Sequence, residues 1–104
     1  MSYNAVVYTI NQTQIFRVWL HKVRDKTAQT RIVARIRNAE AGNLGDSQPV
    51  GECVSEMRVH VGGGYRVYYT MTGKTILLLL VGGDKSTQQS DIKRAINMAH
   101  QLKQ

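Results

Sequence analysis

Three basic side chains fall within one stretch of the chain that has the pattern of successive β-strands. Arg58 lies in the segment VSEMRVH, Arg66 lies in YRVYY, and Lys85 comes shortly after the apolar run ILLLLV. A guanidinium group donates two parallel hydrogen bonds to a phosphate and stays protonated at neutral pH, whereas an ammonium group acts as a point charge. These residue types are suited to binding a nucleic-acid backbone and to neutralising the charge that develops when a phosphate ester is cleaved.

The side chains of a strand alternate between its two faces, so sequence parity predicts which of them lie together. Glu56, Arg58 and His60 share one face of the first segment, and Arg66 and Tyr68 share one face of the next. The opposite, apolar faces carry Cys53, Met57, Val59 and Val61 in the first segment and Tyr65, Val67, Tyr69 and Met71 in the second. If both apolar faces point to the core, we expect two arginines, a histidine and a tyrosine together on an uncovered sheet face.

Cleavage of RNA without a metal uses the substrate's own 2′-hydroxyl as nucleophile, and the protein must hold the backbone and move two protons. We assign Arg58 and Arg66 to stabilising the transition state, with Lys85 as an added charge. His60 shares the Arg58 face, and imidazole titrates near neutrality; an exposed histidine at a strand end is an equal interpretation. Asp91 is another candidate base, although the helix dipole also favours a carboxylate at the start of a helix.

The remaining candidates for contact with RNA have two or more interpretations each. Tyr68 could stack on an unpaired base, or it could be a partly buried structural residue. Arg31 and Arg35, one turn apart on a predicted helix, form a basic strip that could meet ribosomal RNA, an acidic protein or only solvent. The glycines at 62–64 predict a turn and not a phosphate-binding loop, because a loop of that kind leads from a strand into a helix.

Composition and charge limit the class of protein. The 104 residues predict one domain, residues 1–104, and 14 Lys and Arg against 7 Asp and Glu give a formal net charge of +7. Such an excess favours an anionic partner: nucleic acid first, an acidic protein second and a membrane surface third. Cys53 is the only cysteine, so we expect no intrachain disulfide and no thiolate metal cluster, and we expect Cys53 to pack as a small apolar side chain.

The three histidines lack ligand-like spacing, so no metal or other cofactor is expected. The longest apolar run, residues 76–81, is far shorter than the roughly 20 residues of a membrane helix. No targeting segment is apparent either, so we expect a cytoplasmic protein without a membrane partner.

Hydrophobic periodicity predicts the order β-α-α-β-β-β-α. The strands are expected over residues 5–10, 53–61, 65–71 and 75–81. The first helix is expected to begin at about residue 14, and the second to span residues 26–41. The last helix is expected to follow a Ser86–Gln89 capping box. The turn-rich segment 42–51 reads as a loop or a short edge strand. We therefore predict an α+β fold in which the first two helices cover one face of a mainly antiparallel sheet and leave the other face partly open. The unbroken run ILLLLV favours a strand that is buried on both faces.

Three segments of the chain resemble the HigB-like branch of the RelE/ParE toxin superfamily of bacterial addiction modules. They are GNLGDSQPVG, VSEMRVHVGGGYRVYY and LLLVGGDKSTQQSDI, and the resemblance extends to FxxWL at 16–20 and RIxxRI at 31–36. It implies a RelE-like fold and a type II toxin that stops translation by metal-independent cleavage of mRNA, usually on the ribosome. It also implies neutralisation by a cognate antitoxin, often a helix-turn-helix protein.

The resemblance also implies roles for single residues. Arg66 matches the arginine that most often binds phosphate in the family, Arg58 falls at a basic position of the catalytic site, and Lys85 falls where relatives have Arg or Lys. Relatives with established cleavage carry a Tyr or His near the start of the last helix, where this chain has Gln88, Gln89 and Asp91. A non-nuclease toxin like the gyrase-targeting ParE branch, or a plain nucleic-acid-binding module, are the alternative functions.

Overall fold

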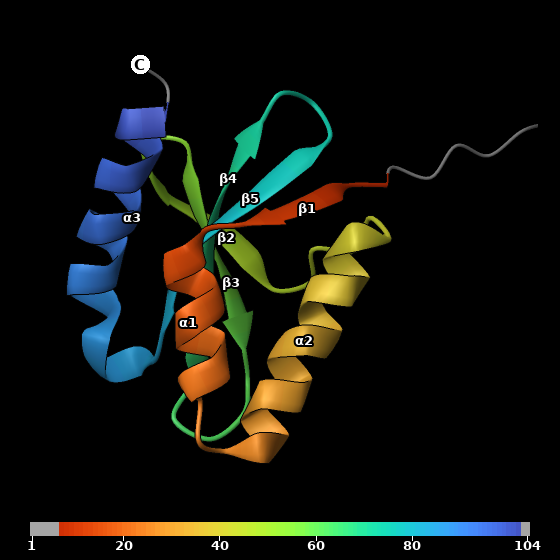
Figure 1. Cartoon of the computed structure of the whole chain (residues 1–104), viewed down its shortest axis with the longest axis vertical. Coiled ribbons are helices and arrows are strands. Elements are labelled where there is room, and N and C mark those ends of the chain that lie inside the picture. The colour runs from red at the N-terminus through yellow and green to blue at the C-terminus, as the bar shows by residue number, and fades with distance from the viewer. Residues whose placement is uncertain (1–6, 103–104) are drawn as a thin grey trace, which may run out of the picture.

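The computed structural model describes residues 7–102, which form a five-stranded sheet with helices packed on it (Figure 1). The elements are β1 (Thr9–Gln12), α1 (Gln14–Lys22), α2 (Lys26–Glu40), β2 (Ser47–Gly51), β3 (Val54–Val59), β4 (Tyr65–Thr72), β5 (Ile76–Gly83), a 3₁₀ turn (Lys85–Thr87) and α3 (Gln88–Leu102). The predicted α+β order is confirmed, and the turn-rich segment contains the edge strand β2. Part of the strand expected over residues 5–10 lies outside the described residues. Within residues 7–102, no helix is long and apolar enough to cross a membrane.

The strand order is β1-β5-β4-β3-β2, with β1 parallel to β5 and the other neighbours antiparallel. Strand β5 lies inside the sheet, and its side chains enter both layers of core. Leu77 and Leu79 belong to the core on one face, and Leu80 and Val81 belong to the core on the other. The prediction of a strand buried on both faces is confirmed.

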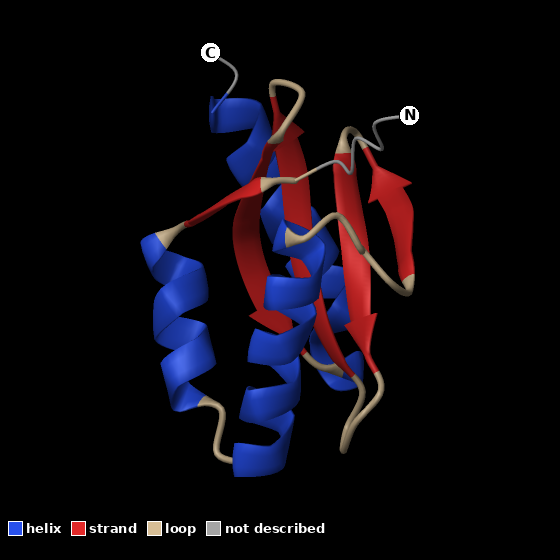
Figure 2. Cartoon of the chain, turned by 90° about the vertical axis from the view of Figure 1, so that its right-hand side faces the viewer, coloured by secondary structure: helices blue, strands red, loops and turns tan. Residues whose placement is uncertain are grey.

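Helices α1 and α2 form a hairpin closed by a short loop (Figure 2). Each begins at a side chain that caps it: Thr13 accepts a hydrogen bond from the Phe16 amide, and Asp25 accepts one from the Ala28 amide. Such caps satisfy backbone donors that have no partner within the helix. The predicted start of the second helix is confirmed, and the hairpin places an apolar stripe of each helix toward the sheet.

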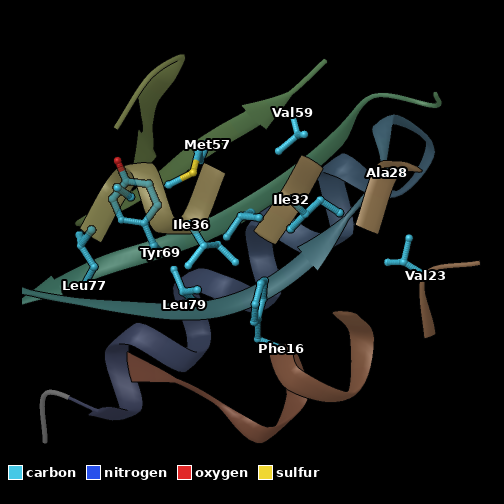
Figure 3. Close-up of a cluster of buried hydrophobic side chains, with 12 residues drawn as sticks. Phe16, Val23, Ala28, Ile32, Ile36, Met57, Val59, Tyr69, Leu77 and Leu79 are labelled. Carbon is cyan, nitrogen blue, oxygen red and sulfur yellow. The ribbon is translucent and has the colours of Figure 1, made fainter. Parts of the chain in front are cut away.

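The larger core lies between this hairpin and one face of the sheet (Figure 3). Ile32 and Ile36 of α2 point at Met57 and Val59 of β3, and Phe16 of α1 lies beside them. Burying side chains of this size removes apolar area from water at roughly 25 cal/mol per Å². The packing confirms the predicted parity of β3 and β4 and therefore turns Glu56, Arg58 and Arg66 to the opposite face.

That opposite face is not open, and our expectation that it would be partly uncovered is wrong. Helix α3 packs on it through Ala95 and Ala99, which are buried against a second core that includes Tyr68 and Leu80. In Figure 1, α3 and α2 lie at opposite sides of the molecule. Alanine side chains allow a helix backbone to lie close to the sheet, so the layer over Tyr68 is tight.

Two local predictions also need correction. Cys53 is exposed at a turn with φ +69°, so it does not pack in the core. The Ser86–Gln89 capping box is replaced by Asp84, whose carboxylate accepts a hydrogen bond from the Ser86 amide at 2.8 Å. This cap starts the 3₁₀ turn, and α3 follows directly from it.

Candidate phosphate-binding site

Arg58 and Arg66 face each other across the antiparallel pair of β3 and β4, and Glu56 is paired with Tyr68 two residues away on the same face. Like charges placed directly opposite on neighbouring strands repel each other. The sequence therefore predicts correctly that the two guanidinium groups lie together, and their closeness requires a negative charge nearby.

Glu56 provides that charge, and it is completely buried. The Arg58 Nε donates to Glu56 Oε2 at 3.1 Å, and the Arg66 Nε lies 3.1 Å from Oε1 as an ion pair whose N–H is not aligned for a hydrogen bond. The side chain of Arg66 is 13% exposed and that of Arg58 is 34% exposed. The arginines are therefore not on the uncovered face that we expected, and the inner edge of each is engaged by one carboxylate. The sequence also allows Glu56 to pair with Arg58, and the structure confirms that pair.

Three neutral side chains complete the surroundings of Glu56. Tyr68 Oη and Gln88 Nε2 donate to Oε1 at 3.2 and 2.9 Å, and Gln48 Nε2 lies 3.4 Å from Oε2. Burial alone raises the pKa of Glu56, but hydrogen bonds from Arg58 and Gln88 and the charge of Arg66 bring this pKa below its ordinary value. The carboxylate is therefore ionised at neutral pH, and it joins β2, β3, β4 and α3 at one point.

Tyr68 cannot stack on a base of RNA, because its side chain is fully buried beneath α3. Burial and the adjacent negative charge of Glu56 raise its pKa above the ordinary value, so the phenol remains a hydrogen-bond donor. The structural interpretation of Tyr68 is the one that the structure supports.

The outer parts of the two arginines and Lys85 form a cationic cluster at the end of the sheet. Arg66 Nη1 donates to the Gly64 carbonyl at 2.9 Å, and the Lys85 amide lies 3.4 Å from the Gly63 carbonyl. A Cβ atom at Gly64, which has φ +77°, would lie 3.6 Å from Arg66 Nη1 and 3.8 Å from the Cβ of Lys85. The glycine turn thus brings exposed Lys85 beside Arg66. Besides Glu56, the carboxylates of Asp46 and Asp84 lie close enough to feel the charges of Arg58 and Arg66, respectively.

His60 and Asp46 form an exposed pair next to Arg58. The His60 Nε2 and Asp46 Oδ2 atoms are 2.5 Å apart, and the hydrogen bond from His60 lowers the pKa of Asp46. The Arg58 amide donates to the Asp46 carbonyl at 2.9 Å, which fixes the loop against β3. Asp46 was not a sequence candidate, although an acid in a turn before an edge strand is a signal that could have found it.

Arg35 is a structural residue and not part of an outward strip. Its Nη1 donates to the Arg58 carbonyl and its Nη2 to the Leu44 carbonyl, so it ties α2 to the loop that carries Asp46. Arg31, one turn earlier, is exposed as predicted. The role of Arg35 thus matches none of the predicted interpretations. Of the predicted pair, only Arg31 remains available to a partner.

Asp91 is buried, and its Oδ2 accepts a hydrogen bond from Thr87 Oγ1 at 2.5 Å. A Cβ atom at Gly83 would lie 1.8 Å from the same carboxylate oxygen, so β5 passes directly against it. This packing matches the helix-start interpretation and contradicts an open catalytic base. Within residues 7–102, no three His, Cys, Asp or Glu side chains are grouped as metal ligands.

The sheet order and the helices on its two faces define a protein of RelE-like α+β fold. The same fold is found in a chain of the toxin–antitoxin complex RelBE2 from Mycobacterium tuberculosis, with a TM-score of 0.52 and 21% identity over 80% of this chain and 97% of that chain. Residues 11–104 match the family described as phage-derived protein Gp49-like (DUF891), and the protein belongs to that family. An uncharacterized protein of Haemophilus influenzae is 42% identical over 93 residues, which cover 89% of this chain and 94% of the relative.

Proposed function

We propose that this protein is the toxin of a type II toxin–antitoxin module, of the HigB-like branch, and that it inhibits translation by cleaving mRNA on the ribosome. The observation that carries the proposal is the convergence of Arg58, Arg66 and Lys85 at one end of the sheet. The shared fold with a chain from a toxin–antitoxin complex supports an antitoxin partner.

In this proposal Glu56 holds the inner edges of the two guanidinium groups, and their outer nitrogens bind the scissile phosphate. Arg58 and Arg66 are fixed before the substrate arrives, so little reorganisation opposes the stabilisation of charge on the phosphate oxygens. Lys85 adds a mobile point charge at the rim. The buried carboxylate is thus a positioning group that does not touch RNA.

The 2′-oxygen forms a bond to phosphorus while the bond to the 5′-oxygen breaks, giving a 2′,3′-cyclic phosphate and a free 5′-hydroxyl. His60, oriented by Asp46, accepts the proton of the 2′-hydroxyl, and the leaving oxygen takes a proton from solvent. A carboxylate that orients an imidazole is the arrangement that makes a histidine an effective base.

Induced expression of variants in cells tests the proposal. Arg66→Lys keeps a positive charge for Glu56 but loses the planar fork, and Lys85→Ala changes an exposed side chain. Loss of one well-placed donor lowers turnover by about 10²- to 10³-fold, so Arg66→Lys should relieve growth arrest. Lys74→Ala, in the exposed turn at the other end of β4 and β5, is the matched control for Lys85→Ala. Equal arrest from the wild type and Arg66→Lys would remove Arg66 from the mechanism.

A non-nuclease toxin on the same fold, such as an inhibitor of gyrase, is the second candidate. The engagement of both arginines by Glu56 favours it, because each has less freedom to bind phosphate than an unpaired side chain. This function predicts arrest of DNA replication while messages stay intact. Measuring thymidine incorporation beside message length after induction separates the two.

A further inference from the structure

Helices α1 and α2 lie side by side (Figures 1 and 2). Side chains of both helices line a groove along α2. Its middle is a cavity of about 680 Å³ between the two helices. Two further hollows share residues with this cavity and continue it toward the start of α2 and toward β1. The lining of the middle cavity is Leu20, His21, Lys26, Gln29, Thr30, Val33, Ala34 and Arg37.

The groove has an apolar floor and a basic rim. Leu20 and Val33 form the floor. The side-chain Nε2 of Gln29 donates to the Leu20 carbonyl at 2.9 Å, so that backbone oxygen is already satisfied. Lys26 and Arg37 lie at the rim, and exposed Arg31 lines the hollow at the start of α2. Among residues 7–102, Glu40, at the β1 end, is the only acidic side chain that lines the three hollows.

We infer that this groove is the docking site for an amphipathic helix of an acidic protein partner. A helix that binds in a groove places its apolar residues on the floor and its polar residues at the rim. The 15 residues of α2 span about 22 Å, which matches a partner helix of about four turns. Thr30 and Ala34 are small and exposed, so a second helix can lie close to α2 along this line. The cationic rim pairs with acidic residues that flank the apolar stripe of the partner.

A protein helix fits the groove better than RNA does. Specific binding of unpaired RNA relies on aromatic side chains that stack on bases. None of the described residues that line the three hollows is Phe, Tyr or Trp. A phosphate backbone also gains nothing from covering Leu20 and Val33, whereas an apolar helix face removes both from water.

The groove and the cationic cluster lie on opposite faces of the sheet. Helix α2 packs on the sheet face that carries Met57 and Val59, whereas Glu56 and Arg66 belong to the face that α3 covers. An occupant of the groove therefore leaves the cationic cluster uncovered, and partner and RNA would use separate surfaces. The inference does not depend on cleavage of RNA by this protein.

Binding of a synthetic peptide tests the inference. The probe is a fluorescein-labelled helical peptide of about 16 residues, rich in Glu, with Leu at positions i, i+3, i+4 and i+7. The control peptide has the same composition with its leucines spread around the helix. Fluorescence anisotropy with the full chain should show at least about tenfold tighter binding of the amphipathic peptide, because only that peptide buries a continuous apolar stripe.

Variants place the binding at the groove. Val33→Glu puts a charge on the floor and Arg37→Glu reverses a rim charge, and each should weaken binding by about tenfold or more. The matched controls are Val18→Glu on α1 and Arg94→Glu on α3, at residues that do not line the groove. Both control variants should bind the peptide as the wild type does. Circular dichroism confirms that each variant is folded.

Four results would overturn the inference: equal binding of the two peptides, equal loss in the control variants, displacement of the peptide by single-stranded oligouridylate, or burial of the groove in a dimer of this chain. Arg37→Glu should still arrest growth as the wild type does, so failure here is distinguishable from failure of the proposed nuclease.

Discussion

Replacing Glu56 by Gln tests whether one buried carboxylate holds the two arginines in place. The change keeps the size of the side chain but removes its charge, so Arg66, only 13% exposed, loses the carboxylate that contacts it. Breaking a buried ion pair by removing one partner costs about 3–5 kcal/mol. We expect about 3 kcal/mol, the lower end of that range, because Arg58 is 34% exposed and water can solvate it.

Thermal and urea unfolding, followed by circular dichroism at pH 7, measure this loss. For a domain of this size about 3 kcal/mol lowers Tm by about 12–24 °C. The control Glu40→Gln, at an exposed acid at the end of α2, should change stability by less than about 0.5 kcal/mol. Arg66→Met combined with Glu56→Gln closes a double-mutant cycle, for which we expect a coupling energy of at least about 1 kcal/mol. A loss below about 1 kcal/mol for Glu56→Gln, or a coupling near zero, would refute this account of the site.

Three further predictions concern the surroundings of the site. The folded-state pKa of Glu56 is lowered from 4.5, so its contribution to stability is fully present above that pH and is lost as the pH falls through the lowered pKa. In acid unfolding, the wild type should show this fall in the free energy of unfolding, and Glu56→Gln should lack it. Tyr68→Phe removes one donor to a charged acceptor and should lower the free energy of unfolding in urea by about 2 kcal/mol. The folded variant should still arrest growth. Loss of growth arrest at unchanged stability would instead make Tyr68 an RNA contact. Gly82→Ala should destabilise the protein by about 1–3 kcal/mol, because the new Cβ would lie 2.2 Å from the Trp19 ring. Gly63→Ala should be near neutral, because no atom lies within 4 Å of the new Cβ. Equal melting temperatures for the two variants would contradict this packing.

Local physical rules were enough to predict most of the fold. Alternation in VSEMRV and YRVYY correctly separates Met57 and Val59 from Arg58 and Arg66, because only one register buries both apolar sets. The cap at Asp25 and the doubly buried β5 likewise follow from short segments of sequence. These features depend on neighbours in the chain, which a single sequence displays directly.

The errors concern contacts between distant segments. The periodicity of α3 predicts an apolar stripe, but it does not say which face of the sheet the stripe covers, so the covering of the face that carries Glu56 and Tyr68 was missed. A charged residue such as Glu56 on a strand is ordinarily solvated, and here its burial depends on Gln48 from β2 and Gln88 from α3. Arg35 was placed on an outward strip for the same reason, because its carbonyl partners lie in a loop and in β3, far from it in the sequence.

The measurement that tests the central claim most directly is a map of RNA 5′ ends in cells after brief induction of the wild type and of Arg66→Lys. If the cluster of Arg58, Arg66 and Lys85 cleaves messages through the 2′-hydroxyl, new ends that carry a 5′-hydroxyl accumulate within coding regions for the wild type and are reduced by about 10²-fold or more for the variant. Growth arrest by the wild type with messages intact, or the same new ends from both proteins, would contradict the claim.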